Sequence, residues 1–189
     1  MHLRPVCLLS LSLLLTACAT APSVAPPAAA PVLATMGTLE RAEAALAPAS
    51  ASLASGRLVL VSEPGAVHLT GILGGLPANA QVAFHIHQTG DCSAVDASSA
   101  GPHFNPLGHS HGGPSTASRH LGDLDNLQTD GRGRVSVDIR APGVVLGGGA
   151  ANDILGRAVV IHAQPDDQHS QPAGNAGARI ACGVIRAQP

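Results

Sequence analysis

Short stretches in which apolar and polar residues alternate recur from residue 44 to residue 186, separated by turns rich in Gly and Pro. This alternation predicts β-strands, because successive side chains of a strand point to opposite faces of a sheet. A hairpin turn is expected at Glu63-Pro64-Gly65. Residues 39–46 (LERAEAAL) are ambiguous between a helical turn and an opening strand, and we favour the strand. The expected strands are 44–46, 56–62, 67–73, 82–87, 121–127, 135–140, 157–162 and 180–186. About eight short strands without a long helical period predict an all-β antiparallel sandwich or barrel.

The N-terminal residues have the pattern of a bacterial lipoprotein signal. Arg4 precedes an apolar run, Val6–Leu15, that is too short to span a bilayer, and small residues stand directly before Cys18. We therefore expect a signal peptide at 1–17, lipidation of Cys18, an Ala/Pro-rich tether at 18–35 and a folded domain at 36–189. The alternative is an ordinary secretory signal cleaved nearby. Either signal predicts an exported protein of the bacterial periplasm or cell envelope, and the lipid anchor would be its only attachment to a membrane.

The charge of the chain bears on whether it binds nucleic acid. All ten basic side chains are Arg, and without the predicted signal nine Arg face twelve acidic residues, a net charge of −3. Nothing in this charge balance indicates nucleic-acid binding.

Of the four cysteines, Cys7 would leave with the signal and Cys18 would carry lipid. The remaining pair, Cys92 and Cys182, is expected to form a disulfide in an exported protein.

Histidines are concentrated between residues 85 and 120, and Asp123 follows them. His85 and His87 are two residues apart on a predicted strand, so both rings leave the same face. One group of three imidazoles and a carboxylate suits structural zinc, and a second, all-nitrogen group suits copper. A shared imidazole can bridge two metals through its two ring nitrogens. The expected zinc group is His103, His111, His120 and Asp123, and the copper group is His85, His87, His103 and His162. His109 competes with His111 for one position, whereas His68 and His169 are expected to be ordinary surface residues.

Several motifs occur in the order found in one known family. FHIH, SAGPHFNP, HGGP, RHLGDL, VVIH followed by DD, and GNAGARIACGVI together resemble the copper/zinc superoxide dismutase family, of the exported bacterial type. The resemblance implies an eight-stranded antiparallel Greek-key sandwich or barrel with long metal-binding and active-site loops. It also implies an enzyme that converts superoxide to O2 and hydrogen peroxide by alternating reduction and reoxidation of one copper ion, with one structural zinc ion beside it.

The resemblance assigns roles to individual residues. It supports the copper and zinc groups given above, and the register of HGGP selects His111 over His109. Asp166 would link His85 to His111, and Arg179 would hold the superoxide anion beside copper. His103 would release copper on reduction and deliver a proton, so that His103 and Arg179 are the expected catalytic residues. The disulfide between Cys92 and Cys182 would attach the ligand loop to the last strand.

Two departures from the family pattern concern the approach of the substrate. Ala173 stands where the family commonly has Thr, and the segment between His162 and Arg179 is short and contains no Lys. We therefore expect weaker electrostatic steering of superoxide. Three alternatives to the enzyme are a copper/zinc-binding envelope lipoprotein without activity, a copper-only relative and an adhesive sandwich. Whether the protein is a monomer or a homodimer stays open.

Overall fold

A computed structural model describes residues 29–188 of the chain. The predicted signal peptide, Cys18 and most of the predicted tether lie outside these residues. Within them, no helix is both long enough and apolar enough to cross a membrane. The described residues form a 3-10 helix at Ser98–Ala100 and the strands β1 (Arg41–Pro48), β2 (Ser55–Glu63), β3 (Ala66–Gly74), β4 (Gln81–Val82), β5 (Phe84–His87), β6 (Leu127–Gln128), β7 (Val135–Pro142), β8 (Ala158–His162) and β9 (Arg179–Ala187).

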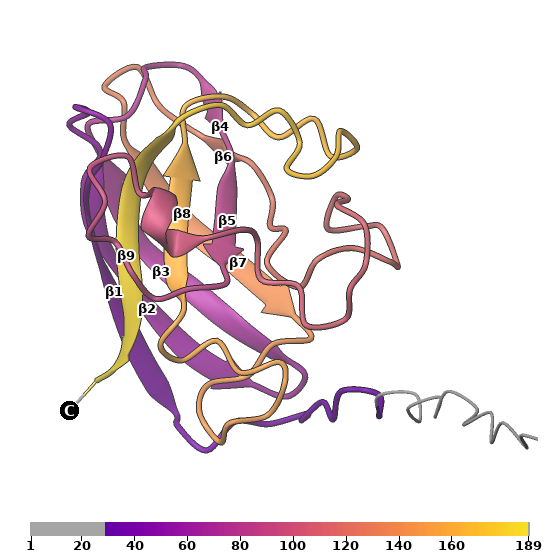
Figure 1. The fold of residues 1–189 in the computed structure, drawn as a ribbon. Helices are drawn as coiled ribbons and strands as arrows, with labels where there is room; N and C mark the ends of the chain where they lie inside the picture. Colours follow the sequence, from indigo (N-terminus) through magenta and orange to yellow (C-terminus); the bar gives the residue numbers. More distant parts are fainter. Residues whose placement is uncertain (1–28, 189) are drawn as a thin grey trace, which may run out of the picture. The chain divides into compact units, whose positions relative to one another are not determined.

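Seven of these strands form one curled antiparallel sheet (Figure 1), in the order β5-β8-β9-β1-β2-β3-β7. β4 and β6 pair separately. β2 and β3 form the predicted hairpin, in which Glu63 pairs with Ala66 around Pro64-Gly65. The all-β antiparallel fold expected from the alternating pattern is confirmed. Its fold neighbours among solved structures, described below, share the Greek-key barrel that the family resemblance implies.

The core lies between the two sides of the curled sheet and is aliphatic apart from Phe84 and Phe104. On β2 the side chains alternate, because Leu58 and Leu60 are buried, whereas Arg57 is exposed and Val59 is only partly buried. Removing each large apolar side chain from water contributes roughly 1.5–3 kcal/mol. The inward residues of β5 are Phe84 and Ile86. His85 and His87 consequently point to the opposite face of β5, where long loops cover them.

Two predicted strands differ from the structure. Residues 82–87 form two strands, because Val82 pairs with β6 whereas Phe84–His87 pairs with β8. The expected strand at 121–127 was wrong, since only Leu127–Gln128 forms a strand there. Instead, the main chain of Gly122 and Asp123 lies against β5, where Gly122 accepts a hydrogen bond from Ile86 at 2.9 Å. This short contact brings the Asp123 carboxylate to the histidines, and the pairing with β5 does not extend into a regular strand.

Residues 32–39 lie along the segment 143–153. The Asn152 side chain is buried and bonds both main-chain groups of Ala34, accepting from its N–H at 2.9 Å and donating to its C=O at 2.8 Å. Further along, the Leu39 N–H donates to Leu146 O at 3.0 Å. The last residues of the predicted tether are thus bonded to the domain. The division at residue 36 stays a prediction.

Candidate metal centre

The histidines expected to bind metal converge on the outer face of β5. His85 and His87 come from β5 itself, and His162 ends the neighbouring β8. The long loop after β5 returns along the same strand, where Phe104 N–H donates to Ile86 O at 2.8 Å. This return places His103 beside the β5 histidines. Two groups result in which every ligand atom lies within 4.8 Å of the others: His85, His87, His103 and His162, and His103, His111, His120 and Asp123.

The nitrogens of the first group have their lone pairs turned toward one another. His87 Nδ1 lies 2.8 Å from Gly101 O, and His162 Nδ1 lies 3.3 Å from Gly177 O. Because a carbonyl oxygen can only accept a hydrogen bond, Nδ1 carries the proton in both rings. The remaining Nε2 atoms of His87 and His162 are 3.3 Å apart and both unprotonated. His85 Nδ1 and His103 Nε2 are buried without any hydrogen-bond partner. Four converging lone pairs in a buried site fit a cation, and an all-imidazole set suits copper.

The second group converges on one oxygen. Asp123 Oδ1 lies 2.8 Å from His103 Nδ1, 3.1 Å from His111 Nδ1 and 3.1 Å from His120 Nδ1. The other carboxylate oxygen accepts the main-chain N–H groups of Gly112 and His120, which fixes the orientation of the carboxylate. Three imidazoles and one carboxylate form the closed four-ligand set that suits zinc. His103 belongs to both groups, with Nδ1 on this side and Nε2 on the copper side.

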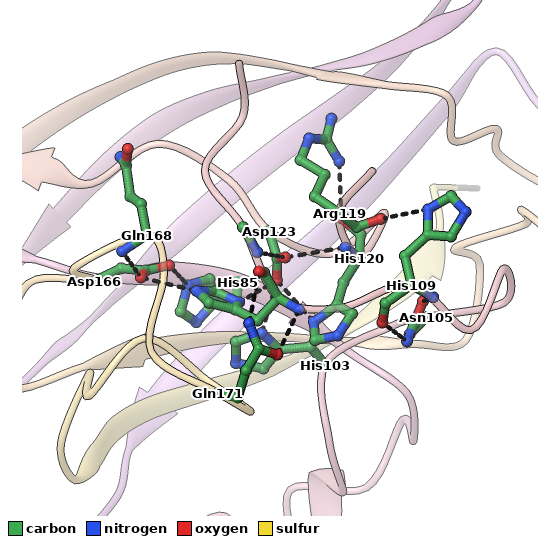
Figure 2. A network of polar contacts seen from close by, with 12 residues as sticks. His85, His103, Asn105, His109, Arg119, His120, Asp123, Asp166, Gln168 and Gln171 are labelled. Carbon is green, nitrogen blue, oxygen red and sulfur yellow. Dashed lines mark hydrogen bonds and ion pairs between the residues drawn. The ribbon is translucent and has the colours of Figure 1, made fainter. Parts of the chain in front are cut away.

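Asp166 lies behind both groups, as expected from the sequence. Its two oxygens accept from His85 Nε2 and from His111 Nε2, each at 2.9 Å. Figure 2 shows Asp166 beside His85. These bonds require a proton on Nε2 of both rings, so Nδ1 is the nitrogen that each ring turns toward its metal group. The Asn126 side chain accepts from the Asp166 N–H at 2.8 Å and donates to the Asp166 C=O at 2.9 Å. Gly174 packs directly against Asp166 with φ +65°, and a Cβ atom there would collide with the carboxylate.

Burial and the carboxylates decide the charge of the site. Burial lowers the pKa of His87 to about 2, of His162 to about 3 and of His103 to about 4, so these rings are neutral at pH 7. Burial would also raise the pKa of Asp123, but hydrogen bonds from three histidines hold it well below its usual range. In His111, burial acts to lower the pKa, yet Asp123 and Asp166 raise it to about 9. A metal that binds here therefore displaces a proton from His111.

Arg179 lies where the copper group borders a solvent-accessible cavity. Its guanidinium donates to Ala97 O and Gly101 O, both at 2.8 Å, and it makes no ion pair with any residue in the part of the chain that the structure describes. Burial lowers the pKa of Arg179, but a guanidinium stays charged at neutral pH. The adjacent cavity of about 640 Å³ is lined by Gln88, Pro102, His103, Asn105, His120, His162, Pro172, Ala173 and Arg179. A small anion that enters this cavity meets both the guanidinium and the bridging histidine.

The loop that holds Arg179 is attached covalently. The predicted disulfide between Cys92 and Cys182 is present, with the two Cα atoms 5.7 Å apart. It joins the loop that carries Ala97 and Gly101 to β9, which begins with Arg179. Gly101 O also accepts from His87, so the same loop orients a copper-group histidine and the arginine.

His109 does not join the zinc group. Its Nδ1 lies 3.2 Å from Arg119 O, and Asn105 bonds both main-chain groups of His109 (Figure 2). Of the two candidates in HSH, the structure brings His111 to Asp123. His68 and His169 lie at the surface beside acidic residues, outside both metal groups.

Two polar residues beside the site were not expected from the sequence. Asn126 holds Asp166, and Gln171 bonds the main chain of His111 at 2.8 and 2.9 Å. Both residues carry side-chain amides and lie in loops, where no regular spacing along the sequence predicts which side chain will reach a metal ligand. Only the motif neighbourhood, RHLGDLDN and DDQHSQP, could have drawn attention to them.

Known proteins resemble this chain in sequence and in fold. Residues 54–185 match the family model for copper/zinc superoxide dismutase (SODC). Cu-Zn superoxide dismutase 2 of Aquifex aeolicus (strain VF5) is 50% identical over 115 residues, which are 59% of this chain and 67% of that protein. The Cu-Zn superoxide dismutase of Schizosaccharomyces pombe (strain 972 / ATCC 24843) is 49% identical over 117 residues, 59% of this chain and 74% of that protein.

Solved structures agree with the sequence comparison. A SOD-like protein from Bacillus subtilis has a TM-score of 0.67 at 35% identity, covering 75% of this chain and 95% of its own. The clock protein EA4 has a TM-score of 0.71 at 36% identity, covering 80% and 96%. Because the family model spans most of the described domain, and the two metal groups lie together on the expected face of β5, this chain belongs to the copper/zinc superoxide dismutase family.

Proposed function

We propose that this protein is a superoxide dismutase that converts superoxide to O2 and hydrogen peroxide with one copper and one zinc ion per chain. The observation that carries this proposal is the sharing of His103 between two buried ligand groups, next to a cavity lined by the Arg179 guanidinium, which forms no ion pair among residues 29–188. Relatives with closely similar sequences are named Cu-Zn superoxide dismutases. The reaction is a transfer of single electrons, and bound copper supplies the redox couple for it.

The residues of the chain supply the binding and the protons. The cationic Arg179 attracts the superoxide anion and holds it in the cavity close to His103 and His162. His103 has one nitrogen in each metal group, so a proton taken up at Nε2 would stand at the cavity while Nδ1 stays with the zinc group. Asp166 keeps His85 and His111 in the tautomers that present Nδ1. The zinc group fixes His103 in place and takes no part in electron transfer.

The alternative of a metal-binding lipoprotein without activity is less well supported. Holding copper requires the four imidazoles but no arginine at the mouth of the cavity. Arg179 is held there by two carbonyl groups and bonds no carboxylate among residues 29–188. A half-buried cation that lines the same cavity as His103 suits catalysis on an anion such as superoxide. The copper-only alternative is disfavoured because all four zinc-group residues are present and converge.

We also propose that the protein works in the bacterial periplasm or cell envelope, anchored through lipid on Cys18. The support is in the sequence, which places an apolar run and small residues directly before Cys18. The disulfide between Cys92 and Cys182 fits an oxidising compartment. Mass spectrometry of the protein from membranes would show a diacylated or triacylated N-terminal Cys18. An unmodified N-terminus elsewhere would contradict the anchor.

Metal content and dismutation, measured on the same purified sample, test the function. After loading, we expect one copper and one zinc per chain and rapid loss of superoxide. Arg179→Ala should keep both metals and lower the rate at least tenfold, because it removes the charged group that holds the anion in the cavity. Arg186→Ala, an exposed arginine on the same strand, is the matched control and should keep the rate. Full metal occupancy without dismutation in the wild type would favour the metal-binding lipoprotein.

A further inference from the structure

His111 is a zinc-group residue that no regular element supports. It lies in the stretch between β5 and β6 where residues 105–120 form neither helix nor strand, yet it is only 4% exposed. In a strand, a ladder would pair its main-chain N–H and C=O. In a buried loop, these groups need other partners, because an unpaired buried main-chain group is costly.

Gln171 supplies both partners. Its Oε1 accepts the His111 N–H at 2.8 Å, and its Nε2 donates to the His111 C=O at 2.9 Å. Nε2 also lies 3.2 Å from His169 O, within its own loop. A primary amide both donates and accepts at adjacent atoms, so it satisfies one residue's main chain as a neighbouring strand would. Figure 2 shows Gln171 extending to the ligand cluster from the side opposite Arg119.

We propose that Gln171 is a positioning residue for zinc. Asp166 fixes the ring of His111 from behind, and Gln171 fixes its main chain, so the direction of Nδ1 toward Asp123 is determined from two sides. The next residue, Gly112, donates to Asp123, so a shift of the His111 main chain would also disturb the zinc-group carboxylate. This inference deepens the proposed function and rests on the assignment of zinc to the group around Asp123.

The proposal predicts an effect on zinc and not on copper. The hydrogen bonds of the Gln171 side chain go to His111 and His169, and neither residue belongs to the copper group. A general loosening of the loop 163–178 would instead affect both metals, because Asp166 in that loop bonds the copper-group His85. Selectivity for zinc is therefore the signature that separates positioning from mere loop stability.

The test compares Gln171→Met, which keeps the length of the side chain and removes both hydrogen bonds, with Asn175→Ala. Asn175 is exposed and bonds Asp167 and Ser170 inside the same loop, so it is a matched control for loop order. Zinc affinity is measured by competition with a chromophoric chelator, using protein expressed from the full chain, and copper affinity is measured in parallel. We expect Gln171→Met to weaken zinc binding 10–100-fold, as removal of partners behind a ligand typically does. Copper affinity should stay unchanged, and Asn175→Ala should leave both metals unchanged.

A second variant keeps the test decisive if Gln171→Met does not fold. Gln171→Glu keeps an acceptor for the His111 N–H but turns a carboxylate oxygen toward its C=O, so its zinc affinity should fall below that of the wild type. Cobalt placed in the zinc group should show altered ligand-field bands in both variants. Wild-type zinc affinity in both variants, an equal loss of copper, or an equal loss in Asn175→Ala would overturn the proposal. Failure of the wild type to bind zinc would instead refute the proposed function.

Discussion

Replacing Gly174 with alanine should damage the metal centre far more than the same change at a glycine of similar conformation elsewhere. Gly174 has φ +65°, and its added Cβ atom would overlap the Asp166 carboxylate and come within 2.8 Å of His111 Nε2. Gly149 has φ +71° and no atom within 4 Å of an added Cβ, so Gly149→Ala is the matched control. Both variants carry the cost of a left-handed backbone at a non-glycine residue, about 1–2 kcal/mol. Only Gly174→Ala must also displace Asp166.

The additional cost follows from the bonds that Asp166 makes. Its oxygens accept from His85 and His111 at 2.9 Å each and from the Gln168 N–H at 2.6 Å. A hydrogen bond to a charged group contributes about 1.5–3 kcal/mol, so losing one of them adds that amount. We expect the free energy of unfolding to fall by about 2.5–5 kcal/mol in Gly174→Ala and by about 1–2 kcal/mol in Gly149→Ala.

Denaturant titration of the chelator-treated protein measures both free energies, and metal analysis after dialysis measures the second consequence. Gly174→Ala should lose zinc, since displacing the partner of a ligand commonly costs 10–100-fold in affinity. Gly149→Ala should keep its full metal content. Equal stability losses and equal zinc contents in the two variants would show that Asp166 does not act as described.

Three further predictions concern protonation, ligand choice and steering. The metal-free protein should lose stability as the pH falls from about 6.5 toward 4, because His87, His103 and His162 have lowered pKa values in the folded state and the unfolded chain takes up their protons first. Each of these histidines should lower the free energy of unfolding by up to roughly 1.4 kcal/mol per pH unit. The pKa of His111 is raised to about 9, so its stabilising effect is fully present below pH 6.5 and is lost only as the pH rises through 9. Its contribution is therefore constant between pH 6.5 and 4 and does not offset the loss. A free energy of unfolding that stays flat between pH 7 and 4 would contradict these assignments. His109→Ala should retain zinc whereas His111→Ala should lose it, and metal analysis that gave the reverse would exchange their roles. The dismutation rate should depend only weakly on ionic strength, because the short segment before Arg179 contains no Lys; stopped-flow rates that fall steeply with salt would show strong steering.

Much of the site was predictable because its chemistry is written in residue types and short spacings. His85 and His87 alternate with core residues on one strand, so their common face follows from the strand period alone. The hairpin at Pro64-Gly65 and the alternation of β7 were predictable for the same local reason. The disulfide followed from the cysteine count once the two N-terminal cysteines were set aside.

Segments whose shape depends on distant contacts were not predictable in this way. Residues 121–127 are apolar enough for a strand, but contact with Ile86 and delivery of Asp123 to the histidines overrule that local preference. Likewise, residues 82–87 read as one strand, and only the pairing of Val82 with β6 shows that they are two.

The sequence by itself determined the ligand types, the all-β alternation and, through its motifs, the family to which the chain belongs. Tertiary structure alone decided which histidine nitrogens carry protons, because those protons are placed by carbonyl groups and carboxylates from remote segments, such as Gly177 and Asp166. It also places His111, which the register of HGGP already favoured over His109, against Asp123, and it alone shows that Gln171 holds the His111 main chain. Loop residues follow no periodic rule, so their positions are fixed only when buried polar groups find partners across the fold.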